Sequence, residues 1–322
     1  MMKRKEFLKT SAAAACIPYL MLPDKTSAAD EEKTPDVVAV SNGEPAAMVD
    51  KAIEALGGMK MFVKKGQTVA VKPNVAWRRP PENGANTNPH VVKRIIEHCL
   101  DAGAGKVYVF DHAVQKADIA YQKSGIGKAA KAAGGIIVPA DKEEKYQKTE
   151  FKKAKWLKER AVHETWLEAD VLIDLPVLKQ HRGAKMTCGI KNLMGCVWDR
   201  NAYHNRNTEL FNTRLQQNIA DFLTLRKPDL TVVDAYRVTL RMGPQKADTK
   251  KDVVTKKMLF ASPDVVAADA IASRVLIDTE PKSHQEELRF YKTEDVSHIK
   301  IAHEMGLGNM NLDNQAVKRI TM

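Results

Sequence analysis

The chain is 322 residues long, and its 51 basic and 40 acidic side chains give a formal net charge of +11 at pH 7. Its 17 glycines, 14 prolines and four cysteines, with 44% apolar residues, exclude a collagen-like repeat, a disordered polymer and a disulfide-stapled miniprotein. Residues 1–29 contain five basic and two acidic side chains, so residues 30–322 carry +8 and form one large domain or two modest ones.

The N-terminus has the pattern of an export signal. Basic residues 3–5 precede an apolar run over residues 11–22, and small side chains follow up to Ala29. A helix of twelve residues spans about 18 Å, whereas the hydrocarbon layer is ~30 Å thick. We therefore predict a signal peptide over residues 1–29, a periplasmic or otherwise exported protein, and no transmembrane segment in residues 30–322.

The export route is left open by the residues near the start. Arg4 and Phe7 fit the twin-arginine pattern, as do Leu8 and Lys9, but Lys5 stands where the second arginine belongs. Lipid attachment at Cys16 is the less favoured alternative to a free N-terminus, because the leucine usual three residues earlier is missing.

Short apolar runs alternate with helical patterns along the rest of the chain. Strands are expected at 37–40, 68–71, 106–110, 135–138, 171–175, 230–234 and 258–260, and helices at 44–56, 91–102, 117–133 and 263–275. Strands that are apolar on both faces and joined by helices predict an α/β fold, with a mainly parallel, Rossmann-like sheet covered by helices on both faces. We treat residues 30–322 as a single α/β domain.

Two charged segments, 141–160 and 245–257, interrupt this alternation. Both mix basic and acidic residues, which favours solvated connections over a nucleic-acid surface. We expect no nucleic-acid partner.

Polar residues at strand ends mark the first part of a candidate site, because ligands of parallel sheets bind there. Lys72 and Asn74 flank Pro73 at the end of a strand. Thr87 and Asn88 precede a helix, where they either help to bind an anion or only cap the helix.

The segment 178–195 forms the second part of the candidate site. If it is helical from Ala184 onward, Thr187, Lys191 and Gly195 share one stripe. Apolar neighbours would lower the pKa of Lys191 and favour a nucleophile, an imine former or an anion clamp; the alternative is a lysine whose stem packs while its ammonium reaches water. His181 is a candidate general acid/base, and His204 a second proton carrier or a metal ligand.

Other polar or thiol residues are interpreted mainly as structural. Cys188 and Cys196 are expected to be buried thiols, with a disulfide as the alternative, and the cysteines do not suffice for an iron–sulfur cluster. Asp221 either pairs a lysine or is structural, and Asp234 either orients a cation or is structural.

Several motifs in one order resemble the family known as domain of unknown function 362. The resemblance runs from about Val37 to Ile320 and rests on the segments 71–74, 87–89, 179–181, 187–195, 243–244 and 262–264, with Gln180 where the family has threonine. The family name implies no activity. From the residues themselves we assign His181, Lys191 and His204 to catalysis, and the following residues to substrate binding: Lys72, Asn74, Thr87, Asn88, Lys179 and Asn192. Many relatives carry a ferredoxin-like domain, whose cysteines this chain lacks, so no intrinsic iron–sulfur cluster is expected.

The chain also distantly resembles the N-terminal domain of nickel-pincer lactate racemases. In that family a lysine holds the cofactor, a later histidine binds nickel, and earlier histidines move the proton. His181, Lys191 and His204 fall at comparable positions. The resemblance implies a divalent metal as a candidate cofactor.

Three functions compete at this point. The first is an enzyme that acts on a small anionic substrate, a carboxylate or a phosphate ester, through a lysine and histidine cleft. The second is an accessory protein for an iron–sulfur or haem redox partner, and the third is a non-catalytic ligand-binding module.

Overall fold

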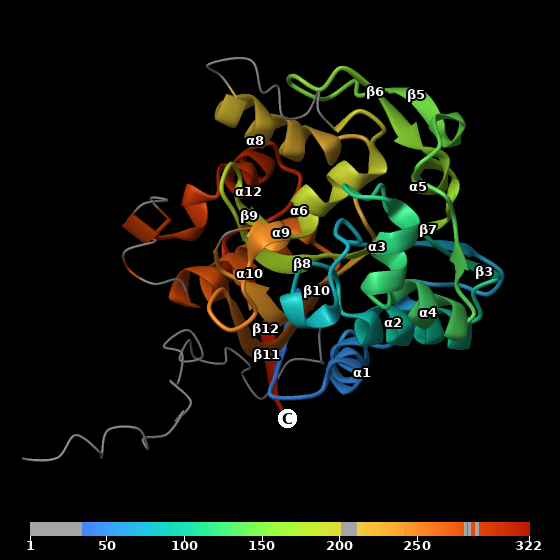
Figure 1. The fold of residues 1–322 in the computed structure, drawn as a ribbon, viewed down its shortest axis with the longest axis horizontal. Coiled ribbons are helices and arrows are strands. Elements are labelled where there is room, and N and C mark those ends of the chain that lie inside the picture. The colour runs from blue at the N-terminus through green and yellow to red at the C-terminus, as the bar shows by residue number, and fades with distance from the viewer. Residues whose placement is uncertain (1–33, 201–210, 242, 280–281, 283–284, 287–289) are drawn as a thin grey trace, which may run out of the picture.

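A computed structural model describes residues 34–200, 211–241, 243–279, 282, 285–286 and 290–322 (Figure 1). The predicted signal peptide, Cys16 and His204 lie outside the described residues. Within them, no helix combines the length and apolar character needed to cross a membrane.

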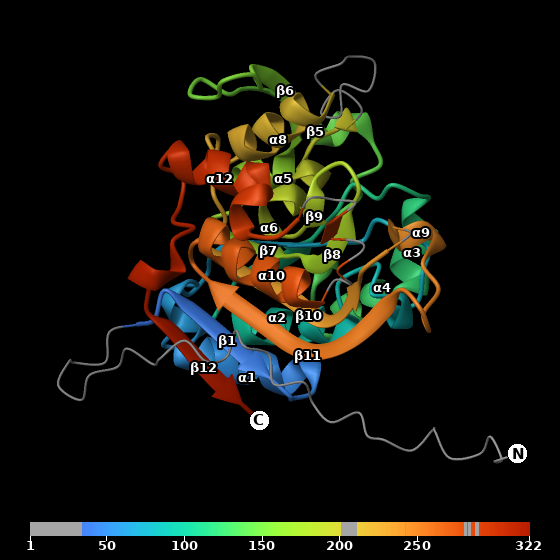
Figure 2. The ribbon, with the colours of Figure 1, turned by 90° about the vertical axis from the view of Figure 1, so that its left-hand side faces the viewer.

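A mixed β-sheet forms the centre of the described chain, in the order β12-β1-β11-β10-β7-β2-β3-β4. Figure 2 shows β12, β1 and β11 side by side at one edge. The strands of this path are β1 (Val37–Ser41), β2 (Thr68–Pro73), β3 (Lys106–Val109), β4 (Ile136–Ile137), β7 (Val171–Leu175), β10 (Leu230–Thr239), β11 (Val253–Ser262) and β12 (Val317–Thr321).

The strand order reverses between β2 and β7. From β2 the chain proceeds outward to β3 and β4, returns to β7 on the other side of β2, and continues outward to β10, and the four pairs that these five strands form with one another are all parallel. Only β11 runs antiparallel to its two partners on this path, β1 and β10. The mainly parallel α/β sheet that the sequence predicts is confirmed, and the reversal is the switch point typical of Rossmann-like folds.

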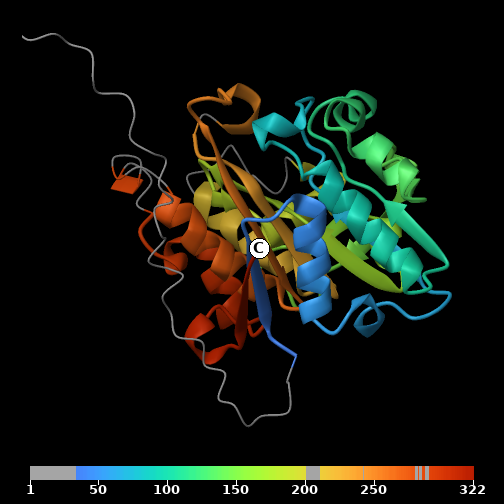
Figure 3. The same cartoon turned by 90° about the horizontal axis from the view of Figure 1, so that it is seen from below.

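Helices cover both faces of the sheet, as predicted (Figure 3). On one face, an apolar core lies under α1 (Pro45–Ala55), α2 (Pro89–Asp101), α3 (Ala117–Lys123) and α4 (Ile126–Ala132). On the other face, a second core lies among α5 (Glu164–Glu168), α6 (Gly189–Asn192), α8 (Phe211–Phe222), α10 (Val265–Thr279) and α12 (Ser297–Glu304). The short helix α9 (Gly243–Lys246) precedes β11.

The structure differs from the sequence prediction where strands are short or charged. The segment 141–160, expected as a solvated connection, contains β5 (Tyr146–Glu150) and pairs with β6 (Glu159–His163) in a separate antiparallel hairpin. β11 likewise includes part of the second charged segment, 245–257. These strands lack continuous apolar runs because one side of each is exposed to water.

The helix predicted over 117–133 is divided into α3 and α4. Gly125 separates them with a φ of +75°, a left-handed conformation that glycine adopts without steric strain. The hairpin of β8 (Val177–His181) and β9 (Lys185–Thr187) was not predicted, and neither was β12.

Asp221 of α8 anchors the loop that links β5 to β6. Its carboxylate is fully buried and accepts backbone N–H groups from Lys155, Trp156 and Leu157 at 2.7–3.0 Å. Lys155 contributes its backbone N–H to Asp221 rather than its ammonium. Asp221 is therefore a structural residue, because one carboxylate satisfies three consecutive donors.

We predict that Asp221→Ala lowers the free energy of unfolding by about 2 kcal/mol, because the loop loses an acceptor shared by three N–H groups. Urea denaturation measures the change. Asp101→Ala, at an exposed position at the end of α2, is the control and should leave stability within about 0.5 kcal/mol of the parent. Equal effects of the two substitutions would contradict the anchoring role.

Candidate functional site

The candidate site begins at the switch point of the sheet, where β2 and β7 are neighbours. In their register Lys72 pairs with Asp174, and Pro73 with Leu175. Both polar side chains lie on the face of α6, because side chains alternate along a strand and their neighbours Val71 and Ile173 belong to the opposite core. The topology thus brings a lysine and an aspartate together at the position where parallel sheets bind ligands.

Lys72 is a fully buried cation with a carboxylate partner. Its Nζ lies 2.7 Å from Asp111 Oδ1, with the two side chains 0% and 3% exposed. The same ammonium donates to the Pro73 carbonyl at 3.1 Å and to Asn192 Oδ1 at 3.2 Å. Asp111 Oδ2 accepts the N–H of Val75 at 2.6 Å. The charge of Lys72 is therefore neutralised inside the protein.

Asn192 connects α6 to both strands through all of its hydrogen-bonding groups. Its Oδ1 accepts from Lys72 Nζ and from Asn74 Nδ2, the latter at 2.9 Å. Its Nδ2 donates to the Lys72 carbonyl at 3.1 Å and to Asp174 Oδ1 at 2.7 Å. Because a carboxamide offers two acceptor and two donor positions, this side chain is fully used in fixing the site.

Lys179 of β8 is a second buried lysine on the same network. Its Nζ donates to Asn74 Oδ1 at 2.9 Å and to the Ala85 carbonyl at 2.6 Å. Burial is the main cause that lowers the pKa of Lys179 to about 7, and the positive charge of Lys191 lowers it further. Thr87 supports the same loop, because its hydroxyl donates to the Leu175 carbonyl and accepts the N–H of Asn74.

The predicted helix over 184–195 is wrong in part. Residues 185–187 form β9, α6 covers only Gly189–Asn192, and a 3-10 turn continues over Leu193–Cys196. Thr187 is thus in a strand, and the expected stripe of Thr187, Lys191 and Gly195 does not exist. The helix begins at Gly189 because Asp269 of α10 accepts the N–H groups of Gly189 and Ile190, at 2.6 and 3.0 Å.

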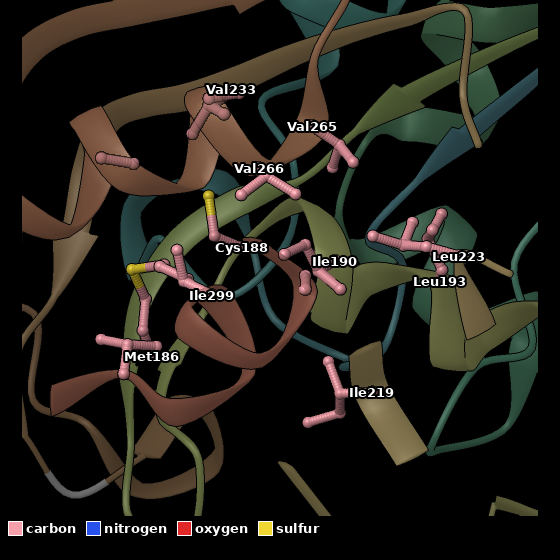
Figure 4. Packing of buried hydrophobic residues seen from close by; sticks show 14 of the residues in the cluster. Met186, Cys188, Ile190, Leu193, Ile219, Leu223, Val233, Val265, Val266 and Ile299 are labelled. Carbon is pink, nitrogen blue, oxygen red and sulfur yellow. The ribbon is translucent and has the colours of Figure 1, made fainter. Parts of the chain in front are cut away.

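Gly189 lies at the start of this helical segment and Gly195 near its end, and at both positions a larger side chain would collide with its neighbours. A Cβ on Gly189 would lie 2.7 Å from Val265 Cγ2 and 2.8 Å from Asp269 Oδ1. A Cβ on Gly195 would lie 2.8 Å from Lys72 Nζ and collide with Asp111. Figure 4 shows apolar side chains of the segment 186–193 among residues of the neighbouring helices, including Ile219, Val265, Val266 and Ile299.

Lys191 differs from the other two lysines. Its side chain is only partly buried, and no hydrogen bond or ion pair holds it within the described part of the chain. Burial lowers the pKa of Lys191 to about 8, and the charges of Arg200 and Lys72 add to that effect. This is the direction that its apolar neighbours in the sequence predict.

Arg200 adds a further cation near Lys191. Its guanidinium donates to the His112 and Ala113 carbonyls, both at 2.9 Å. The His112 ring stacks on Trp198 with centroids 5.0 Å apart and donates from Nδ1 to the Val197 carbonyl at 3.0 Å. Burial lowers the pKa of His112. These contacts join the end of β3 to the loop that follows α6.

His181 and Asn88 have local structural contacts. His181 Nδ1 accepts the N–H groups of Gly183 and Ala184, at 3.1 and 3.0 Å, and so closes the β8–β9 turn. Asn88 Oδ1 accepts the N–H of His90, which makes Asn88 the N-cap of α2, the alternative that the sequence left open. Asp234 accepts the backbone N–H groups of Asn88 and Tyr236, which fits the structural role that the sequence offered for it.

The segment from residue 69 to residue 274 matches the family described as "Domain of unknown function (DUF362)". The chain belongs to this family. The membership that the sequence motifs predict is confirmed. A thylakoid-associated protein of Synechocystis sp. is 30% identical over 248 residues, which make up 73% of this DUF362 chain and 70% of that protein.

Two solved structures are similar to the DUF362 chain at low identity. The lactate racemase apoprotein from Thermoanaerobacterium thermosaccharolyticum has a TM-score of 0.44 at 12% identity, and the match covers 71% of this chain. A protein from Thermotoga maritima has a TM-score of 0.41 at 10% identity, over 67% of this chain. The DUF362 chain spans 55% of each of those chains. At these TM-scores the likeness carries no functional conclusion.

Acidic residues of the DUF362 site were missed by sequence reasoning. Asp174 Oδ2 is buried with no hydrogen-bond partner among the described residues, and burial raises the pKa of Asp174 well above its usual value. Burial also raises the pKa of Asp269 to about 7. A usable sign was present for both, because Asp174 is the one carboxylate of an otherwise apolar strand and Asp269 lies within the apolar run 265–272 of α10.

Cys188 and Cys196 are buried free thiols, so the disulfide alternative is wrong in this structure. Among the residues that the structure describes, no three His, Cys, Asp or Glu side chains gather in a way that could hold a metal ion. The metal assignment of His204 falls outside those residues and stays a prediction.

We predict that Asp269 makes the stability of this DUF362 protein pH-dependent. Its folded pKa of about 7 is above the unfolded value near 3.9, so the folded state holds the proton between these values. The stabilisation is complete below about pH 4 and is lost as the pH rises through 7, with a total of about 4 kcal/mol.

The measurement compares wild type with Asp269→Asn by urea denaturation from pH 4 to pH 8. Because other buried groups titrate in both proteins, the difference between the two free energies isolates Asp269. The free energy of unfolding of the wild type should fall relative to that of Asp269→Asn as the pH rises. A difference that stays constant over the range would show that Asp269 is ionised throughout.

Proposed function

We propose that this DUF362 protein is an exported enzyme that acts on a small anionic substrate at Lys191. The observation that carries the proposal is the state of this amine: partly exposed, without a partner in the described chain, and with a pKa of about 8. A lysine kept only for structure would be expected to have its ammonium paired or fully in water.

The balance of charge around Lys191 favours an anion. Lys72 is neutralised by Asp111, whereas no carboxylate is within bonding distance of Lys179 or Lys191 in the described residues. Burial raises the pKa of Asp174 well above its usual value, which favours the protonated form that carries no negative charge. An anion beside Lys191 would therefore compensate cations that the protein leaves uncompensated.

The same charge balance changes the role proposed for Lys72. Its Nζ is enclosed by three acceptors, so it has no donor to spare for a substrate. We propose that Lys72, Asn74, Thr87 and Asn192 hold the site in shape, and that Lys179 contributes positive potential. Asn88 supports the same region as a helix cap.

A pKa of about 8 makes Lys191 chemically useful. At pH 7 about one molecule in ten has the neutral amine, compared with about one in 2,500 for an ordinary lysine. The neutral amine is a nucleophile toward a carbonyl group and a proton acceptor, whereas the ammonium binds an anion. His181 and His204 remain candidate proton carriers for the reaction.

We predict that Lys191→Met abolishes turnover while the melting temperature stays within a few degrees of the parent. The assay is a panel of small carboxylates and phosphate esters followed by NMR, including deuterium exchange from solvent. Lys131→Met, at an exposed position on α4, is the matched control and should retain full activity.

Amine labelling tests the chemical basis directly. Acetic anhydride modification of Lys191, quantified by peptide mass from pH 6 to pH 10, should give a midpoint near 8. Turnover that survives in Lys191→Met, or a Lys191 midpoint above 10, would rule out the proposed role. Anion binding without any turnover would favour a ligand-binding module.

A further inference from the structure

His298 is a buried histidine that the proposed function has not used. It lies in the first turn of α12 and is 0% exposed. Its backbone N–H and its ring Nδ1 lie 3.2 and 2.7 Å from Gln216 Oε1, on α8. The ring is thus held on one side by a single amide oxygen.

The hydrogen bonds of Gln216 decide which ring nitrogen carries the proton. Gln216 Nε2 donates to the Gly183 carbonyl at 3.2 Å, and a carbonyl can only accept. This fixes the amide so that Oε1 faces His298. Because Oε1 also can only accept, Nδ1 must carry the hydrogen, and Nε2 of the neutral ring presents a bare lone pair.

This lone pair has no hydrogen-bond partner in the described chain. Leaving a buried acceptor unpaired costs about 1–3 kcal/mol. Protonation of the ring does not relieve the cost, because burial, and then the charge of Lys191, lower the pKa of His298 to about 3. Nε2 is therefore a neutral acceptor throughout the physiological pH range.

His298 and Lys191 belong to the same region of the fold. The helices that carry them, α12 and α6, both pack against α8 and α10. In Figure 4, Ile190 and Ile299, the chain neighbours of the two residues, lie in one apolar cluster. Lys191 is also the charged group that acts on the His298 ring.

We infer that His298 Nε2 accepts a hydrogen bond from the anion bound at Lys191, so that the site selects small anions with an O–H or N–H group beside the negative charge. The inference rests on the proposed function, because it needs an anion at Lys191. It makes His298 a specificity-determining residue rather than a proton carrier.

Selection follows from the two kinds of group in the site. The ammonium of Lys191 attracts any anion, whereas a bare lone pair repels oxygen atoms that carry no hydrogen. An anion with a donor satisfies both groups, and one without a donor leaves Nε2 unpaired. We expect a preference of tenfold or more for the first kind.

Phosphate and sulfate are the matched probes. At pH 8 both are mostly dianions of similar size, but only hydrogen phosphate carries a proton. Calorimetric titration of the full chain should show phosphate binding at least tenfold more tightly than sulfate. In His298→Phe the two affinities should agree within about twofold, and in the control Lys131→Met the preference should be unchanged.

A measurement on the wild type covers the case in which His298→Phe does not fold. Nitrogen-15 NMR of the histidine rings should show the Nε2 resonance of His298 in the bare lone-pair range, shifting on addition of phosphate and not of sulfate. A His298 resonance that phosphate does not move would overturn the inference.

The failure of this inference is distinguishable from that of the proposed function. If both anions bind with equal affinity, or if folded His298→Phe keeps the preference, the role of His298 is wrong while anion binding at Lys191 stands. If Lys191→Met binds phosphate as tightly as wild type, or if neither anion binds, the proposed function fails and this inference fails with it.

Discussion

The buried ammonium of Lys72 is the constraint on which the rest of the site depends. A charge removed from water must be paired, and its loss of a partner is strongly destabilising. Lys72 is paired with the carboxylate of Asp111 and donates a hydrogen bond to the amide of Asn192. Gly195 has no side chain, which leaves room for the Lys72 ammonium. The ion pair therefore dictates what can occupy the end of β2 and how closely the segment after α6 approaches it.

This rigid base explains why Lys191 can remain unpaired. Asn192, its neighbour in the chain, is held by four hydrogen bonds, so the backbone of Lys191 has little freedom to move. The backbone of Lys191 is fixed while its ammonium has no partner among the described residues, so the side chain is held in position before a ligand binds. Such preorganisation lowers the cost of binding and of catalysis.

The fold could be predicted from the sequence wherever strands are apolar on both faces, and Lys72 was placed correctly at a strand end. The β5–β6 hairpin was not found, because its strands mix charged and apolar residues like a surface connection. Asp111 and His298 were not assigned to the site because their significance depends on long-range contacts. Nothing in the local sequence shows that Gln216 orients the His298 ring.

The reversed strand order has a consequence for how the protein folds. Lys72 and Asn192 are 120 residues apart in the chain, and they meet only after β7 has joined β2 in the sheet. Contacts of such high sequence separation form late, because a long loop must close before they add stability. During synthesis the segment up to β4 therefore leaves the ribosome with Lys72 and its carboxylate partner Asp111 but without Asn192, and the later half of the chain both completes the core and supplies the amide that completes the hydrogen bonds of the Lys72 ammonium.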